Sequence, residues 1–294
     1  MAPPPSPEAQ PPTPPPSTTA GSSPPIEAGA AGFFGTQFLA SISNPELAIQ
    51  SLFPLALGQV QLRPDPLDTA LQIQALHQLR GAASSNPDEG CAWTGDLNGV
   101  WQLHRQPQFA PLIQTISGHA ASYLERLGFD QSRLALHIQR CWPVVSELGQ
   151  VVGRHHHPNA HLSAVYYLNG DGSGRSGCLR FFPPRQPNEL VPGLAVGHDG
   201  PIQPNSAATQ WNAPWFDLAP RAGLLVLFPA SVDHAVLENE DADDSRFSIS
   251  LDLVLTAPPA PQAGATPASQ PASRQASPPE YLAPHPADWQ AVDW

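Results

Sequence analysis

The sequence predicts a mainly β protein with N-terminal helices, whose strands form a helix-buttressed sandwich or jelly roll. Between residues 44 and 127, apolar residues recur at helical spacing, whereas after residue 133 they alternate with polar ones. Helices therefore come first and many short strands follow. A parallel α/β sheet is excluded, because it would interleave the two kinds of element.

The helical part is predicted in pieces. Residues 44–46 (Asn-Pro-Glu) begin one helix, since they supply a good N-cap, a proline at the first position and an acid in the first turn. Residues 68–80 form a second helix that ends at Gly81, a suitable C-cap. Residues 109–127 form a third with one broad apolar face, and residues 93–101 are expected to be a turn-rich loop.

The strands are predicted as short segments bounded by Gly, Pro, Asn and Asp. They cover residues 134–139, 162–168, 178–182, 223–228, 234–237 and 246–255. The last is the clearest, because apolar residues at odd positions alternate with Arg246, Ser248, Ser250 and Asp252.

Proline separates the folded part from the ends of the chain. Many of the 38 prolines lie in residues 1–32 and 257–294, which lack hydrophobic periodicity and are expected to be disordered. The domain then covers residues 33–256, with the jelly-roll core at about 134–256. In the tail, Tyr281, Trp289 and Trp294 are either a docking motif for a partner or part of an untethered segment.

Charge and cysteine content restrict the partners and the compartment. The net charge is −12, from 13 basic and 25 acidic residues, so neither nucleic acid nor an anionic membrane surface is expected as a partner. No secretory signal and no membrane-spanning apolar run is recognised. Three widely spaced cysteines suggest reduced thiols in the cytoplasm.

Histidines form the first candidate site. At a strand end, residues i and i+2 project to the same side, so His155 and His157 face inward while His156 faces out. An open transition-metal site needs a third ligand, for which His234 is the best candidate because it follows a buried strand and a short turn. A solvated histidine loop is the alternative, and the histidines alone do not decide between the two.

Arg246 is the second candidate. It opens the last strand with Ser248 on the same face, and an arginine facing a barrel interior calls for an anion such as a carboxylate. The chain has no lysine, so arginine is its only permanent side-chain cation. Alternatively, Arg246 pairs with the acids of residues 238–244, which are expected to form a solvated hairpin loop.

Two stretches, HHHPNAHLSAVYYLNGDGSGRSGCLRFFPPR and PRAGLLVLFPASVDHAVLENEDADDSRFSISLDL, resemble the Fe(II)/2-oxoglutarate-dependent oxygenases. More narrowly they resemble the bacterial and phage 2OG-Fe(II) oxygenases, with a core of the form HxHP…SGVYYL…FPxxxxH…RxSxxxN. The segment YYLN…SGCLRFFP also resembles prolyl hydroxylases. The resemblance covers about residues 50–256.

This resemblance implies a double-stranded β-helix (a jelly-roll, cupin-like core) with iron held by His155, His157 and His234. It implies that Arg246 and Ser248 bind the distal carboxylate of 2-oxoglutarate. Tyr167 and Leu179 would line the cosubstrate pocket, with Tyr166 in the other layer. The expected reaction couples O₂ and the decarboxylation of 2-oxoglutarate to succinate with the oxidation, usually hydroxylation, of a small-molecule or peptide substrate.

One position departs from the wider superfamily, which uses two histidines and a carboxylate. His157 stands where the carboxylate is expected, and Ala164 replaces a glycine. Three arrangements remain open: three histidines, two histidines with a free position, or an aspartate from another loop. Two other functions also remain open, a three-histidine cupin-type metalloenzyme without 2-oxoglutarate and a metal-free jelly-roll binding module.

Overall fold

The computed structural model describes residues 54–86, 88–184, 213–258, 283 and 285–288. The chain divides into Met1–Phe53 and Pro54–Trp294, and every described element belongs to the second unit. The head at 1–32, the helix start at 44–46, and the aromatic residues Tyr281, Trp289 and Trp294 lie outside the described residues.

Two 17-residue helices precede most of the strands: α1 (Pro66–Ala82) and α2 (Ala110–Arg126). The Asp65 carboxylate caps α1 by accepting from the N–H of Leu67 at 2.7 Å. The prediction that Gly81 ends this helix is wrong. The helix continues past Gly81, and the chain leaves through Ala83 in an extended conformation that needs no left-handed residue.

Short 3₁₀ turns occur at Asp96–Asn98, Leu103–Arg105, Pro107–Phe109, Gln131–Arg133 and Pro286–Asp288. The strands are β1 (Gly58–Gln61), β2 (Trp93–Thr94), β3 (Ala135–Ser146), β4 (Val152–His155), β5 (Leu162–Tyr167), β6 (Leu179–Phe181), β7 (Phe216–Leu218), β8 (Leu224–Pro229), β9 (His234–Val236) and β10 (Arg246–Thr256).

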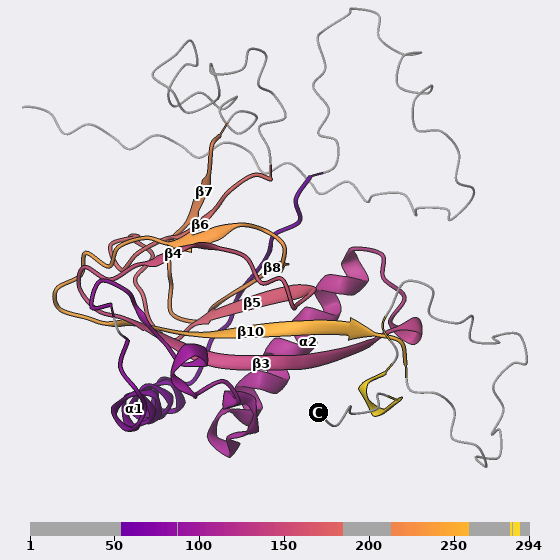
Figure 1. The fold of residues 1–294 in the computed structure, drawn as a ribbon, viewed down its shortest axis with the longest axis horizontal. Coiled ribbons are helices and arrows are strands. Elements are labelled where there is room, and N and C mark those ends of the chain that lie inside the picture. Colours follow the sequence, from indigo (N-terminus) through magenta and orange to yellow (C-terminus); the bar gives the residue numbers. More distant parts are fainter. Residues whose placement is uncertain (1–53, 87, 185–212, 259–282, 284, 289–294) are drawn as a thin grey trace, which may run out of the picture. The chain divides into compact units, whose positions relative to one another are not determined.

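These strands form two sheets. The six-stranded sheet has the order β1-β8-β5-β10-β3-β2, and the four-stranded sheet has the order β4-β9-β6-β7 (Figure 1). All pairs between named strands are antiparallel. Of the strands from β3 to β10, four belong to the larger sheet (β3, β5, β8 and β10) and four to the smaller one (β4, β6, β7 and β9). This connectivity is a double-stranded β-helix, so the predicted jelly-roll core is confirmed.

Several strands were absent from the prediction or shorter in it. β1, β4 and β7 are only three or four residues long and so carry little alternation, and β2 lies within the predicted turn-rich loop. β3 extends to Ser146, well beyond the predicted end at residue 139. Sheet pairing rather than local pattern extends it, because β3 runs beside the whole length of β10.

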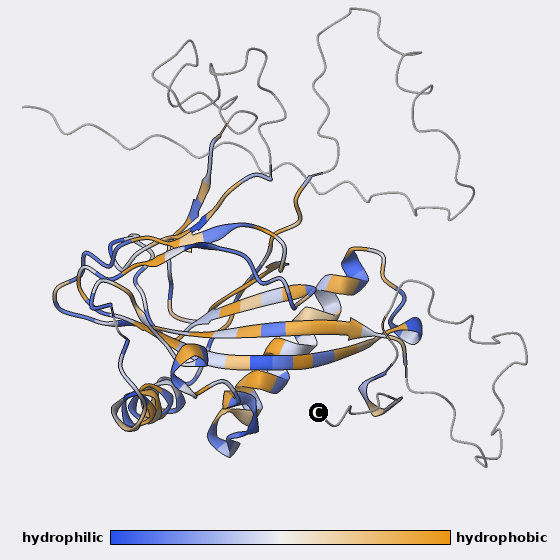
Figure 2. Ribbon diagram, in the orientation of Figure 1, coloured by the Kyte–Doolittle hydropathy of each residue, from blue (hydrophilic) through white to orange (hydrophobic). Residues whose placement is uncertain are grey.

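Two apolar clusters lie on opposite sides of the larger sheet. The first joins the helices to the odd-numbered residues of β10, such as Phe247, Ile249 and Leu251. The second lies toward the smaller sheet and includes Tyr167 and Leu179. Figure 2 shows hydrophilic and hydrophobic residues alternating along β10. Both faces of this strand are nevertheless buried, so its polar residues line the interior of the β-helix.

A β-bulge at Gln139 changes which residues of β3 face that interior. Leu253 is opposite Ile138 and Asp252 is opposite Arg140, so Gln139 is the extra residue on β3. Strict alternation would place Arg140 on the same face as Ile138. The bulge instead turns the arginine toward the interior.

The connection from β9 to β10 is not a hairpin, which corrects the prediction for residues 238–244. β9 belongs to the smaller sheet and β10 to the larger one, so the segment crosses between the sheets. Most of it is exposed, but Asn239 is buried and donates to the Ser146 carbonyl at 2.8 Å.

Ala283 forms a bridge with Thr256, and the His285 ring lies 5.0 Å from the His137 ring, so this short piece of the tail contacts the sheet. Cys91, Cys141 and Cys178 are free thiols. Within the described ranges, no helix is both long and apolar enough to span a bilayer.

Candidate active site

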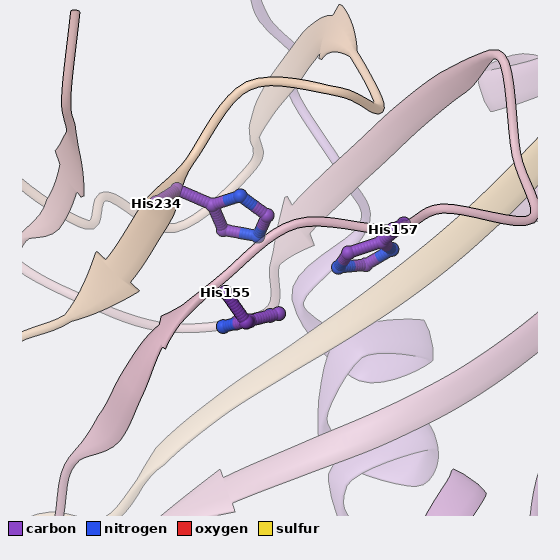
Figure 3. A group of neighbouring side chains, drawn as sticks. All are labelled: His155, His157 and His234. Carbon is purple, nitrogen blue, oxygen red and sulfur yellow. The ribbon is translucent and has the colours of Figure 1, made fainter. Parts of the chain in front are cut away.

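Three histidines converge at one end of the smaller sheet (Figure 3). One nitrogen from each of His155, His157 and His234 lies within 4.8 Å of the others. His234 is 3% exposed and His157 is 8% exposed. The structure therefore brings together the three residues that the sequence nominated as metal ligands.

Strand pairing positions these side chains. His155 ends β4 and His234 begins β9, and the two are direct partners across the antiparallel pair. Opposite residues share a face of the sheet, and the two ring centroids are 4.3 Å apart. His157 lies beyond the end of β4, where its backbone N–H donates to the Ala230 carbonyl at 2.9 Å.

The Nδ1 atom of each ring already has an oxygen partner. His155 Nδ1 lies 2.7 Å from the Gly153 carbonyl, and His234 Nδ1 lies 2.9 Å from the Val232 carbonyl. His157 Nδ1 contacts the Asp252 carboxylate. Because these oxygens accept a proton from Nδ1, the Nε2 lone pair of each ring is left for a metal ion.

Burial favours the neutral form that metal ligation requires. It lowers the pKa of His234 to about 3, and the neighbouring His155 contributes in the same direction. Burial also lowers the pKa of His155, partly offset by its bond to the Gly153 carbonyl. Both rings can therefore bind a cation without first losing a proton.

The donor set fits a transition metal. Imidazole nitrogens suit iron, nickel, copper and zinc, and three of them leave coordination positions for exogenous ligands. In the described part of the chain, the metal-competent group contains no carboxylate. Of the three arrangements left open by the sequence, this geometry matches three histidines, with Asp252 behind His157 rather than among the ligands.

Arg246 lies buried inside the same β-helix with part of its guanidinium unpaired. It is 1% exposed, and its Nη1 donates to the carbonyls of Ser176 and Gly177, both at 3.0 Å. Nε and Nη2 of Arg246 and the Ser176 hydroxyl are buried without a hydrogen-bond partner. No ion pair joins Arg246 to the acids of 238–244 among the described contacts. Two unpaired guanidinium nitrogens fit a carboxylate.

The other predicted cosubstrate residues surround this position. Ser248 is the direct cross-strand partner of Tyr167, and both are buried. Burial raises the pKa of Tyr167 to about 12, and the charge of Arg246 opposes that rise. Leu179 is 1% exposed and belongs to the same apolar cluster.

The apolar cluster that contains Tyr167 and Leu179 also extends to the histidines. It contains Phe181 and Phe228, whose ring centroids lie 6.3 Å and 4.9 Å from that of His234. Tyr166 faces the other way, into the cluster that contacts the helices. The cosubstrate candidates and the metal candidates therefore line one interior.

Other polar residues near the site were not nominated from the sequence. Asp252 was placed only on the polar face of the last strand, and Ser176 carried no signal beyond its glycine-rich surroundings. No sequence pattern indicates that Arg140 faces the interior, because the bulge at Gln139 determines its orientation. His156 is about half exposed and pairs with Asp233 at 3.2 Å, outside the metal group.

A family model matches the part of the chain that contains this site. Residues 140–252 match the family described as "Putative 2OG-Fe(II) oxygenase". No curated protein matches the chain significantly. The matched region begins at Arg140 and ends at Asp252, and it contains the three histidines and Arg246.

Similar solved structures include two proteins of nogalamycin biosynthesis. The non-heme alpha ketoglutarate dependent carbocyclase SnoK is 15% identical, with 71% of this chain and 85% of that chain covered and a TM-score of 0.49. The epimerase SnoN is 17% identical, with coverages of 70% and 82% and a TM-score of 0.46. A Pseudomonas putida prolyl-4-hydroxylase is 18% identical, with coverages of 68% and 92% and a TM-score of 0.43.

The matched family uses Fe(II) and 2-oxoglutarate, with O₂ as the oxidant. The three-histidine group and the unpaired guanidinium are consistent with those two ligands. Residues 140–252 of the chain, which contain the three histidines and Arg246, are therefore similar to the 2OG-Fe(II) oxygenase family.

Proposed function

We propose that the protein is a hydroxylase, in which Fe(II) is held by His155, His157 and His234 and 2-oxoglutarate is held by Arg246. The observation that carries this proposal is the buried Arg246, whose Nε and Nη2 lack partners in the interior that also contains the three histidines. A buried cation with unpaired donors is costly unless an anion completes it. The dicarboxylate 2-oxoglutarate supplies that anion.

The protein's own groups bind and orient the reactants. Arg246 forms a charge-assisted bond with the distal carboxylate, and Tyr167 and Ser248 offer hydroxyls beside it. Leu179 and Phe181 provide an apolar wall that excludes water. The bound Fe(II) and 2-oxoglutarate supply the oxidising chemistry, in which O₂ is consumed and succinate and CO₂ are released.

Iron and cosubstrate binding can be tested without knowing the substrate. Anaerobic protein with Fe(II) and 2-oxoglutarate is expected to show a weak visible metal-to-ligand charge-transfer band. His234→Ala removes a ligand and Arg246→Ala removes the carboxylate anchor, so both variants should lose most of the band at a fixed 2-oxoglutarate concentration. Absence of the band in the unaltered protein, or an undiminished band in both variants, contradicts the proposal.

Arg180→Gln is a matched control for Arg246→Ala. Arg180 forms an ion pair with Asp217 at 2.7 Å, outside the site, so this variant should keep the full band. Hydroxylation itself is tested by comparing the metabolites and peptides of cells with the active protein and with His234→Ala. A product that gains one oxygen only in the active protein is expected.

A three-histidine metalloenzyme that does not use 2-oxoglutarate is the second candidate, and the neutral ligand set favours it. The two candidates predict different effects of the Arg246→Ala substitution on substrate oxidation. If the oxidation of substrate persists without 2-oxoglutarate and is unchanged in Arg246→Ala, the second candidate is correct. Iron analysis of protein prepared without a polyhistidine tag tests the metal-free binding module.

The substrate and location are further proposals. A small molecule or peptide is favoured over nucleic acid or a membrane surface, given the net charge of −12. Three free thiols support a location in the cytoplasm.

A further inference from the structure

Asp252 is the one fully buried carboxylate in contact with a candidate metal ligand in the described part of the chain. Its side chain is 0% exposed, and one of its oxygens contacts His157 Nδ1. The Ser163 hydroxyl lies 3.4 Å from the same nitrogen, and Ser163 is the cross-strand partner of Asp252. The carboxylate therefore contacts the Nδ1 side of the His157 ring, and Nε2 is left for a metal ion.

The second oxygen of Asp252 faces a cation. It accepts from Arg140 Nε at 3.0 Å and also contacts Nη2 of the same guanidinium. The bulge at Gln139 makes this pairing possible, because it turns Arg140 into the interior opposite Asp252. Arg140 is the more exposed partner, at 35%, so water screens part of its charge.

Other contacts fix the position of Arg140. Its Nη1 lies 3.4 Å from an Asp96 oxygen, and its guanidinium carbon lies 5.0 Å from the Trp142 ring centroid. The Trp142 ring centroid is in turn 5.6 Å from that of His157. His157, Asp252 and Arg140 thus form an ordered row that leads from the metal group toward the surface.

The row of His157, Asp252 and Arg140 bears on the charge of the metal site. The usual facial triad includes one anionic ligand, whereas three neutral histidines leave the metal one unit more positive. A carboxylate that accepts from a ligating histidine fixes its tautomer and ring orientation and makes its other nitrogen a stronger donor. Asp252 can therefore supply, through the ring of His157, the negative charge that the ligand set lacks.

We infer that Asp252 is a positioning residue of the metal site, and that Arg140 limits how strongly its charge acts on His157. This inference rests on the proposed function. It assigns a metal-tuning role to a carboxylate that is not itself a ligand. The competing explanation is that Asp252 and Arg140 form an ion pair that only joins β10 to β3.

The test measures Co(II) binding by calorimetry, with protein that carries no polyhistidine tag. Asp252→Asn keeps an oxygen that can accept from His157 but removes the charge, so the Co(II) dissociation constant should rise about 10- to 100-fold. The visible bands of the bound Co(II) should shift as well. Asp217→Asn, which removes a carboxylate at the Arg180 pair, should change neither quantity.

Arg140→Gln separates the two explanations. It breaks the same ion pair but leaves the charge of Asp252 in place, so Co(II) should bind as tightly as in the unaltered protein, or more tightly. If the pair is only structural, Arg140→Gln and Asp252→Asn weaken binding alike, which would overturn the inference. Unchanged affinity and spectrum in Asp252→Asn would do the same.

A double variant tests whether misfolding, rather than the lost charge, explains weaker Co(II) binding. Asp252→Asn with Arg140→Gln leaves no unpaired buried charge, so it should fold and still bind Co(II) about 10- to 100-fold more weakly. Tight binding in the folded double variant counts against the inference. If the unaltered protein binds no Co(II), the proposed function fails. If it binds and Asp252→Asn binds equally, only the role of Asp252 fails.

Discussion

Tyr167 shows how one buried side chain can prepare the site for an anion. It is 1% exposed, and burial raises the pKa of its hydroxyl to about 12. The hydroxyl therefore keeps its proton and can donate to a carboxylate held by Arg246. Tyr166, the next residue, faces the helices because neighbours in a strand point to opposite sides.

Replacing these tyrosines tests that difference. Tyr167→Phe should weaken 2-oxoglutarate binding by about tenfold, since a hydrogen bond to a charged carboxylate contributes about 1.5 kcal/mol. Tyr166→Phe should leave it unchanged. The measurement is a 2-oxoglutarate titration of the Fe(II) protein, followed by the charge-transfer band. Equal dissociation constants in the two variants would exclude a role for the Tyr167 hydroxyl.

The same residue predicts a pH response. Because the pKa of Tyr167 is raised, its neutral, donating form persists above the ordinary tyrosine range and is lost only near pH 12. The ratio of 2-oxoglutarate affinities between the unaltered protein and Tyr167→Phe should therefore stay constant between pH 7 and 10. A ratio that falls about twofold by pH 10, where a tyrosine of ordinary pKa is half ionised, would show an ordinary, solvent-exposed hydroxyl.

At the scale of elements, the loop before β6 supports Arg246. Gly177 adopts a φ of +88°, and a Cβ there would lie 2.2 Å from the Leu237 carbonyl oxygen and 2.9 Å from Arg246 Nη1. The Gly177 carbonyl also accepts from that nitrogen. A glycine is needed both for the backbone conformation and for the close approach.

Gly177→Ala is expected to destabilise the protein and to displace the guanidinium, raising the 2-oxoglutarate dissociation constant at least about tenfold. Gly149→Ala is the matched control. Gly149 has a similar φ of +80°, but a Cβ there would meet nothing within 4 Å. The control should therefore lose stability alone. Thermal unfolding and cosubstrate titration of both variants provide the measurements, and parallel losses of affinity would contradict the assignment.

At the scale of the whole molecule, the proposed metal and cosubstrate would bind residues from both sheets. His234 and His155 come from the smaller sheet, whereas Arg246 and Tyr167 come from the larger one. Binding of metal and 2-oxoglutarate to the folded state alone should therefore raise its stability.

The stabilisation has a calculable size. A ligand at 100 times its dissociation constant adds about 2.7 kcal/mol to the free energy of unfolding. Anaerobic thermal unfolding with Co(II) or Fe(II), and then with 2-oxoglutarate, should show two successive increases in Tm. His234→Ala should lose both increases, whereas Arg246→Gln should keep the first and lose the second. Two increases of full size in both variants would contradict the site.

From the sequence alone one could predict that the helices precede most of the strands, although β1 precedes α1 and β2 lies between α1 and α2. The sequence also predicted the polar and apolar faces of β10 and nominated His155, His157 and His234, which the structure brings together. Local periodicity and the i, i+2 rule are sufficient for the faces of β10 and for His155 and His157, because these depend on neighbours along the chain. His234 was nominated only because it follows a buried strand and a short turn. The family resemblance supplied the cosubstrate roles of Arg246, Ser248, Tyr167 and Leu179, which remain proposals.

The contacts that surround those residues follow from strand pairing and could be found only in the structure. The bulge at Gln139 reverses the facing of Arg140, and its contact with Asp252 joins residues 112 positions apart. Pairing between β3 and β10 sets both, and no local pattern encodes which strand will be the neighbour. For the same reason, the sequence could not reveal the contact of His157 with Asp252 or the unpaired nitrogens of Arg246, and the structure shows both.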